Sequence, residues 1–306
     1  MKAARYHDYG GPEALVIDDI PVPEPGAGEV LIKVAGVGVI PFDWKLMTGT
    51  YRDSIPVKFP SIFGHEVSGV VAKLGHGVTK YEIGDAIYGQ TRRGAAAEFA
   101  TLPVSSSAKA PSTLDLADVA AIPVGGMTAW QALFDHGGLT AGQRVLIHGG
   151  AGGVGMFAIQ LAKWRGAHVI TTASGANAGY VQELGADEVI DYTQQRFEEI
   201  VADVDVVLDT IGGDTQKRSL RVLKPGGILV SIVGLVDPDR FKAEGRRTSA
   251  FSMQPSTSEL DELRDLVEEM KVNVVITVDL PLGRIAEAVT ESMSGHARGK
   301  IVVRVS

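Results

Sequence analysis

A glycine-rich turn between a predicted strand and a predicted helix constrains the fold of this chain more than any other feature. Residues 145–155 (VLIHGGAGGVG) predict a buried apolar strand that ends in a turn, and residues 156–165 predict a helix. Gly150, Gly152 and Gly155 supply the GxGxxG spacing of a dinucleotide-binding turn. The helix would offer free N–H groups and the positive end of its dipole to a diphosphate.

The backbone of this turn is the first candidate for contact with a cofactor. The first glycine permits the tight turn, the second lets a diphosphate approach, and the third lets helix and strand pack closely. A purely structural glycine turn is the alternative, but a second apolar strand at residues 168–172 favours a nucleotide fold. We therefore expect the cofactor at Gly150, Ala151, Gly152, Gly153 and Val154.

Strand and helix patterns alternate around the turn. Strands are predicted at residues 145–148, 168–172, 188–190, 205–209 and 228–233, and helices near residues 154–165, 177–184, 197–201 and 215–223. Such alternation predicts an α/β fold with a doubly wound parallel sheet, the Rossmann arrangement. Earlier in the chain, short strands at residues 30–37, 67–74 and 97–102 are separated by Gly and Pro, which predicts a β-rich domain.

These patterns divide the chain into three segments. Residues 1–123 form the predicted β-rich domain, residues 124–258 the dinucleotide-binding domain, and residues 259–306 a C-terminal return. Residues 237–258 are polar and predict an irregular segment, whereas a helix is expected at 259–270. The chain ends in a lone apolar strand, which we expect to pair with the first domain.

Composition narrows the classes of function. The 306 residues are 45% hydrophobic, enough for two cores, and contain no apolar run long enough to span a membrane. The start of the chain lacks an apolar signal core, so a cytoplasmic protein is expected. A net charge of −8 disfavours nucleic acids and acidic membranes as partners. Cysteine is absent, which excludes disulfides, thiolate nucleophiles and cysteine-ligated zinc.

Several motifs occur together in a characteristic order. They are PFDWK at 41–45, GHEVSGVV at 64–71, GD at 84–85, AGGVG at 151–155 and GKIVV at 299–303. With them the whole chain resembles the medium-chain dehydrogenase/reductase superfamily, and within it the zinc-free quinone oxidoreductase (zeta-crystallin-like) group. The resemblance implies a GroES-like barrel domain, a Rossmann domain, an active cleft between them, and a homodimer or tetramer.

The resemblance also raises the question of zinc. His65 matches a histidine ligand of the zinc alcohol dehydrogenases, but Ile40 and Val124 occupy the positions of two cysteine ligands. Catalytic zinc normally has three protein ligands, and neither Ile nor Val offers a lone pair. We therefore expect no metal, and we expect His65 to be a hydrogen-bonded structural residue near the cleft.

The residues after the glycine turn bear on the choice of cofactor. An NAD site places an acid about 20 residues beyond the glycines, but none occurs between Gly155 and Asn177, which favours NADP(H). Ser174 is placed to donate to the 2′-phosphate, although it is also a possible helix cap. The lysine common in the family is missing, since residues 166–195 contain no Lys or Arg. Asn177, the backbone near residue 175 and Tyr192 are the substitutes; Tyr192 could equally be a packing residue.

Further contacts to the cofactor follow from the resemblance alone. It places Thr128 near the nicotinamide or diphosphate, and Val233 and Gly234 near the nicotinamide. Phe251 and Met253 would reach in from the irregular segment, with simple hydrophobic packing as the alternative.

The resemblance implies hydride transfer from NADPH to quinones or α,β-unsaturated carbonyls, which accept hydride without a Lewis acid. Tyr51, Lys45 and Tyr9 are candidate donors to the developing oxyanion, and Asp43 is expected to orient Lys45 or the backbone. Ile40 replaces a family asparagine, so a dry pocket that prefers apolar acceptors is expected. The rival interpretation is a non-catalytic NADPH-binding protein that senses redox state or binds a partner.

Overall fold

The computed structural model describes residues 1–305 and divides the chain into two compact units. Unit 1 comprises Met1–Val124, Pro255–Met270 and Val274–Ser306, and unit 2 comprises Gly125–Gln254 and Lys271–Asn273. Unit 1 thus combines the N-terminal part of the chain with most of its C-terminal part. The bounds lie within a few residues of the domain boundaries proposed at 123/124 and 258/259.

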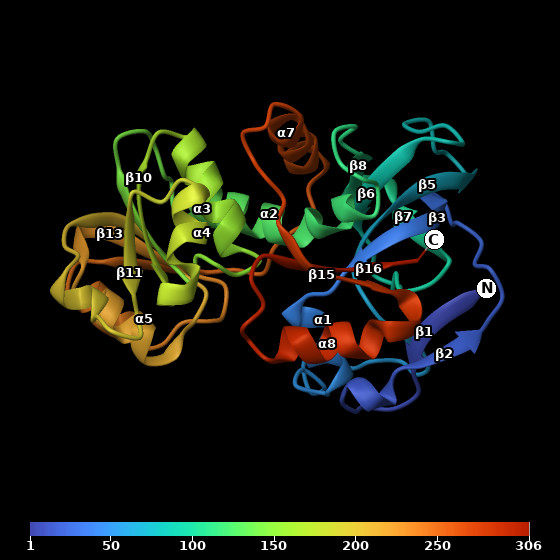
Figure 1. Cartoon of the computed structure of the whole chain (residues 1–306), viewed down its shortest axis with the longest axis horizontal. Coiled ribbons are helices and arrows are strands. Elements are labelled where there is room, and N and C mark those ends of the chain that lie inside the picture. Colours follow the sequence, from blue (N-terminus) through green and yellow to red (C-terminus); the bar gives the residue numbers. More distant parts are fainter. Residues whose placement is uncertain (306) are drawn as a thin grey trace. The chain divides into compact units, whose positions relative to one another are not determined.

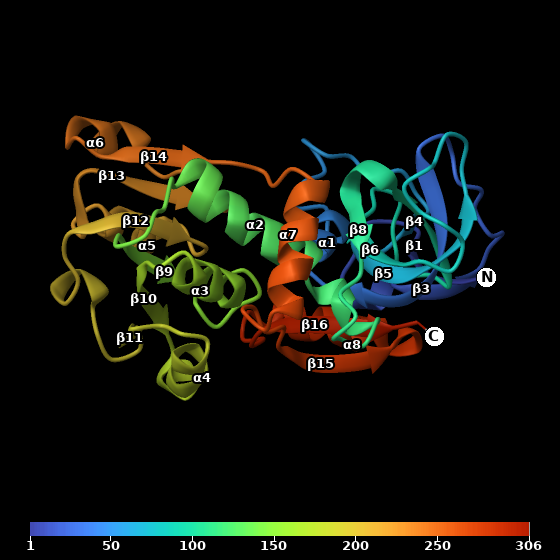
Figure 2. The same cartoon turned by 90° about the horizontal axis from the view of Figure 1, so that it is seen from above.

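Unit 2 contains a six-stranded, all-parallel sheet in the order β11-β10-β9-β12-β13-β14 (Figure 2). Its strands are β9 (Arg144–His148), β10 (His168–Ala173), β11 (Glu188–Asp191), β12 (Val204–Asp209), β13 (Leu223–Ser231) and β14 (Arg247–Ala250). Helices α3 (Gly155–Trp164), α4 (Ala178–Glu183) and α5 (Gly213–Ser219) connect them. This is the doubly wound Rossmann arrangement that the alternating pattern predicts.

Several details of unit 2 differ from the sequence-based expectation. The helix expected at 215–223 ends at Ser219, and β13 begins at Leu223 and ends at Ser231 rather than covering 228–233. The helix expected at 197–201 is only the 3₁₀ turn Phe197–Glu199. The segment expected to be irregular contains α6 (Pro238–Ala243) and the sixth strand, β14. Because β14 pairs only with β13 at the sheet edge (Figure 2), its polar sequence RTSA gives no apolar strand signal.

The core of unit 2 gathers apolar side chains from the central strands. Leu146, Ile170, Val207 and Leu229 are fully buried in one cluster. Helix α2 (Pro123–Trp130) continues as a π-helix over Gln131–His136. Among residues 1–305, no helix is both long enough and apolar enough to cross a bilayer.

Unit 1 is built on antiparallel strands, as expected of a GroES-like domain. Its larger sheet has the order β15-β16-β3-β5-β6-β8 with β7 on β3, and a smaller sheet has the order β2-β1-β4. The strands are β1 (Lys2–Tyr6), β2 (Val16–Asp19), β3 (Glu29–Gly38), β4 (Ser61–Ile62), β5 (Glu66–Leu74), β6 (Ala86–Gln90), β7 (Phe99–Pro103), β8 (Ser107–Lys109), β15 (Ile276–Pro281) and β16 (Lys300–Arg304). The helices are α1 (Pro41–Met47), α7 (Thr257–Glu268) and α8 (Ile285–Met293).

The C-terminal strand returns to the first sheet as expected. Strand β16 lies beside β3 (Figure 1). The two strands pair antiparallel, with Val302 opposite Gly38. It is not a lone strand, however, because β15 pairs with it in parallel and α8 forms the crossover. The sequence of β15, ITVDLP, alternates between exposed and half-buried positions, which explains why its apolar signal is weak.

Candidate active site

The glycine turn after β9 is held by close backbone packing. Gly150 N donates to Thr172 O at 3.1 Å, and Met156 N donates to Gly152 O at 3.0 Å. A Cβ atom at Gly150 would lie 2.0 Å from Thr171 Oγ1, and one at Gly155 would lie 2.3 Å from the carbonyl oxygen of Gly149. Only glycine fits at either position, as the motif predicts.

The middle of the turn is open by contrast. A Cβ atom at Gly152 would meet only Gly149 O, at an ordinary 3.4 Å. Residues 151–154 are half-buried and lead directly into the N-terminus of α3. The backbone of this segment therefore fits a diphosphate, which would accept hydrogen bonds from free N–H groups at the helix start.

A buried polar network supports the turn from below. His148, the last residue of β9, is 1% exposed; its Nδ1 lies 3.2 Å from Thr172 Oγ1 and its Nε2 2.9 Å from Ser219 Oγ. Burial lowers the pKa of His148 to about 4, so the imidazole is neutral at physiological pH. The sequence did not predict that His148 supports the turn. The one indication in the sequence is a polar residue at the end of an apolar run.

The segment after β10 carries the residues expected at the 2′-phosphate. Ser174 precedes a 3₁₀ turn, and its Oγ accepts a 3.2 Å hydrogen bond from Asn177 Nδ2. Tyr192 is 59% exposed. Among residues 1–305, no Lys or Arg forms a hydrogen bond or ion pair with these three side chains.

Tertiary structure adds a carboxylate that the local sequence after the turn lacks. Asp191 ends β11 opposite Ala173, and a Cβ atom on Gly175 would lie 2.6 Å from Asp191 Oδ2. Hydrogen bonds from Thr193 hold the pKa of Asp191 below its usual value. A negative charge thus lies close to the segment proposed to bind the 2′-phosphate, although no acid occurs between residues 155 and 177.

The loops after β12 and β13 are tied together by one buried carboxylate. Asp209 Oδ1 accepts from Ile211 N at 3.0 Å and Gly212 N at 2.8 Å. Its Oδ2 accepts from Gln216 Nε2 at 2.7 Å and from Ser231 Oγ at 2.9 Å. Gln216 in turn donates to the carbonyl oxygen of Gly234 at 2.9 Å, so Asp209 determines where the residues proposed at the nicotinamide lie.

Replacing Asp209 by asparagine is expected to loosen these loops. One carboxylate oxygen becomes an NH₂ group that faces donors, and a buried donor left unsatisfied costs about 1–3 kcal/mol. We expect Asp209→Asn to lower the melting temperature and to raise KM for NADPH about tenfold. Steady-state kinetics and thermal unfolding test this; unchanged KM would show that the loops do not contact the coenzyme.

The remaining cofactor candidates in unit 2 lie on α2, after β13 and after β14. Thr128 is 7% exposed on α2, and Val233, which follows β13, is 46% exposed. Phe251 stacks on His136 with ring centroids 4.3 Å apart, a contact that supports the packing alternative for this residue. Met253 is half-buried one residue before Gln254, whose backbone N–H donates to Gln131 Oε1 at 3.0 Å.

In unit 1 the PFDWK motif forms the start of α1. Asp43 is buried, and its Oδ2 accepts from Ile40 N at 3.0 Å while its Oδ1 lies 2.6 Å from His65 Nδ1. Asp43 therefore orients the backbone, as expected, and His65. It does not orient Lys45, whose ammonium lies 5.5 Å from the Trp44 ring centroid instead. A helix directs side chains at i and i+2 to different faces, so of the two expected alternatives, Lys45 or the backbone, Asp43 holds the backbone.

The aromatic candidates of unit 1 separate into two groups. Phe42 lies between Tyr51 and His65, with ring centroids 6.0 Å and 5.2 Å away. Tyr9 instead packs edge-on against Phe59, and its hydroxyl accepts from Val57 N at 3.2 Å. Tyr51 is thus grouped with His65, whereas Tyr9 is engaged with a neighbouring loop.

Comparisons with known proteins match both units. Residues 26–112 match the alcohol dehydrogenase GroES-like domain family, and residues 184–303 match the zinc-binding dehydrogenase family. The chain is 33% identical to a chloroplast envelope quinone oxidoreductase homolog of Arabidopsis thaliana, over 99% of this chain and 98% of that protein. It belongs to the zinc-free quinone oxidoreductase group of the medium-chain dehydrogenase/reductase superfamily.

Two further relatives of this group are informative. An NADPH-dependent alkenal/one oxidoreductase of Arabidopsis thaliana is 34% identical, over 99% of this chain and 79% of that protein. The solved structure of the quinone oxidoreductase from Coxiella burnetii superposes with a TM-score of 0.92 at 34% identity, covering 100% of this chain and 99% of that one. This chain therefore shares its fold with that quinone oxidoreductase along its whole length.

Zinc, which the name of the second family implies, does not fit this member of the group. Ile40 and Val124 have no ligand atoms, so among these three positions only Nε2 of His65 could bind a metal. Both carboxylate oxygens of the buried Glu66 are taken, one by Lys300 Nζ and one by Val124 N at 2.9 Å. Within residues 1–305, no three His, Asp or Glu side chains are grouped to hold a metal.

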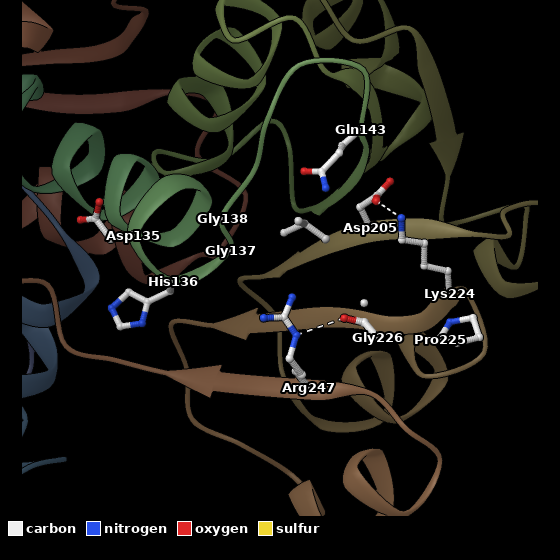
Figure 3. A pocket seen from close by; sticks show the side chains of 12 residues that line it. Asp135, His136, Gly137, Gly138, Gln143, Asp205, Lys224, Pro225, Gly226 and Arg247 are labelled. Carbon is white, nitrogen blue, oxygen red and sulfur yellow. Dashed lines mark hydrogen bonds and ion pairs between the residues drawn. The ribbon is translucent and has the colours of Figure 1, made fainter.

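A cavity of about 430 Å³ in unit 2 is not part of the cofactor site (Figure 3). It lies at the amino ends of β12, β13 and β14, whereas the glycine turn follows the carboxyl end of β9. In its lining, Lys224 contacts Asp205, and Arg247 Nε donates to Gly226 O at 3.1 Å. Ligands of such sheets bind at the carboxyl ends of the strands.

Proposed function

We propose that this protein transfers hydride from NADPH to quinones or α,β-unsaturated carbonyls without zinc. The open backbone at Gly152, between two glycines that packing requires, is the observation that carries the proposal. The similarity to a quinone oxidoreductase homolog and to an NADPH-dependent alkenal/one oxidoreductase supports it. Without a metal, the acceptor itself must be electron-poor.

The residues of the chain would position the coenzyme and the acceptor. NADPH supplies the hydride when bound. The turn at residues 150–154 would bind its diphosphate, Ser174 and Asn177 its 2′-phosphate, and the loops held by Asp209 its nicotinamide end. In unit 1, Tyr51 and Lys45 remain our candidate donors to the oxyanion of the acceptor.

An acceptor screen tests the proposal. NADPH absorbance is followed with 9,10-phenanthrenequinone, short polar enones and alkyl-substituted enones or alkenals, with NADH in parallel. We expect turnover with NADPH and a preference for the apolar acceptors. Tight NADPH binding without turnover across this panel would instead favour the rival function, a non-catalytic redox sensor or partner-binding protein. Metal analysis of the active protein checks that zinc is not required.

Ser174→Asp is expected to reverse the coenzyme preference. A carboxylate in this position would repel the 2′-phosphate and accept a hydrogen bond from the ribose hydroxyl of NADH. We expect kcat/KM for NADPH to fall at least tenfold and that for NADH to rise. Asn177→Lys is the matched opposite change and should lower KM for NADPH, most clearly at low salt. An unaltered NADPH/NADH ratio in both variants would place the phosphate elsewhere.

We propose further that the protein is a cytoplasmic homodimer or tetramer whose partners are small molecules and copies of itself. Strand β14 pairs with β13 on one side only, and an edge strand of this kind is a template for pairing with another chain. The acidic charge disfavours nucleic acids and acidic membranes. Light scattering coupled to gel filtration measures the oligomeric state.

A further inference from the structure

Asp43 and His65 form a hydrogen-bonded pair in unit 1. The Asp43 side chain is completely buried, whereas the His65 side chain is 18% exposed. The 2.6 Å contact joins Asp43 Oδ1 to His65 Nδ1, and the other carboxylate oxygen accepts from Ile40 N. The carboxylate is thus fixed from two sides, and it fixes the imidazole.

This geometry determines which nitrogen of His65 is free to react. A carboxylate accepts hydrogen bonds only, so Nδ1 carries a proton and Nε2 is the free position. Among residues 1–305, Nε2 has no hydrogen-bond partner. The buried carboxylate at Nδ1 also fixes the ring, so that a proton carried on Nε2 points away from Asp43.

The groups around His65 leave its imidazole in contact with one carboxylate, that of Asp43, and not within a larger network of ion pairs. Phe42 packs edge-on against the imidazole and connects it to the ring of Tyr51. The neighbouring carboxylate, Glu66, is paired with Lys300 and therefore does not compete for the imidazole. Asp43 is its one ion-pair partner within residues 1–305.

We propose that His65 is the general acid of the reaction and that Asp43 is its positioning residue; this inference rests on the proposed function. Hydride addition to the β-carbon of an enone moves the electron pair of the C=C bond to the carbonyl oxygen and oxidises NADPH to NADP⁺. The Nε2–H bond of the imidazolium breaks as the proton passes to the enolate. A quinone likewise receives hydride and one proton to become a hydroquinone, and water reprotonates His65.

Three variants test the proposal on the intact enzyme. His65→Gln is expected to lower kcat for an enone about 100-fold, within the range of general acid catalysis. The loss should be smaller for a quinone, because its hydroquinone anion is less basic than an enolate. Asp43→Asn should lower kcat in the same direction, because the amide no longer enforces the proton on Nδ1. His76→Gln, an exposed histidine of the same unit, should leave kcat unchanged.

Measurements other than the rate itself distinguish a catalytic role of His65 from a structural role. The pH profile of kcat with an enone should differ between the wild type and His65→Gln; Asp43, Glu66 and Tyr51 are the other titratable groups nearby. Added imidazole should restore activity to His65→Ala. NADPH affinity and melting temperature should be little changed in His65→Gln.

The possible results are distinct. Wild-type turnover with an unaltered rate and pH profile in His65→Gln would overturn the role of His65 and leave the proposed function intact. An equal loss for enones and quinones, with no imidazole rescue, would also overturn it in favour of a structural role. Absence of wild-type turnover with every acceptor would overturn the proposed function itself.

Discussion

Alanine at position 155 is expected to abolish NADPH binding and to destabilise unit 2, whereas alanine at position 152 is expected to weaken NADPH binding alone. The added Cβ atom of Gly155→Ala would lie 2.3 Å from Gly149 O and 2.6 Å from Gly150 Cα. Both are backbone atoms, so the turn must move, at a cost of more than about 2 kcal/mol. A displaced turn no longer presents its N–H groups to the diphosphate.

Gly152→Ala is the matched variant because its Cβ atom meets no protein atom closer than 3.4 Å. The methyl group would occupy the space through which the diphosphate approaches, so we expect at least a tenfold higher Kd for NADPH with little change in stability. Gly283→Ala, whose Cβ atom has no neighbour within 4 Å, should change neither quantity. Fluorescence titration with NADPH and thermal unfolding measure them; tight binding by Gly155→Ala would show that the turn is not the diphosphate site.

Lys300→Met is expected to destabilise unit 1 by about 3–5 kcal/mol. Lys300 is 4% exposed and Glu66 is 0% exposed, so removal of the ammonium leaves a buried carboxylate with only the Val124 N–H as partner. The pair joins β5 to the C-terminal strand β16, which makes it a tie between distant parts of the chain. Urea unfolding of the variant and wild type measures the difference.

The pH dependence of that loss identifies its cause. Burial raises the pKa of Glu66, and the positive charge of Lys300 opposes the rise. Without Lys300 the folded state holds the proton more strongly than the unfolded state does, so the stability of the variant should fall as pH rises above the usual pKa of a glutamate. The double variant Glu66→Gln/Lys300→Met removes the charge and should recover most of the lost stability. A pH-independent loss would instead indicate a packing defect.

Much of the fold followed from local sequence. The period of the apolar residues and the glycine turn predicted the strand, turn and helix at residues 145–165, and the structure confirms them. Strand β14 was missed because an edge strand is not obliged to be apolar. The helix expected at 197–201 proved to be a short turn. Phe197 and Val201 are apolar because they pack into the core of the sheet, and their spacing does not reflect a helix.

The features of the candidate site also fall into two groups, those that local sequence determines and those that depend on tertiary structure. Local sequence by itself determined the glycine turn, the absence of cysteine ligands and the C-terminal return, because each depends on residue type at short spacing. Only the tertiary structure decided that Asp43 holds His65, that Lys300 neutralises Glu66, that Asp209 connects two loops, and that Asp191 lies beside Gly175. These contacts join residues on different strands and helices, and their partners are chosen by the packing of the sheets rather than by any pattern along the chain.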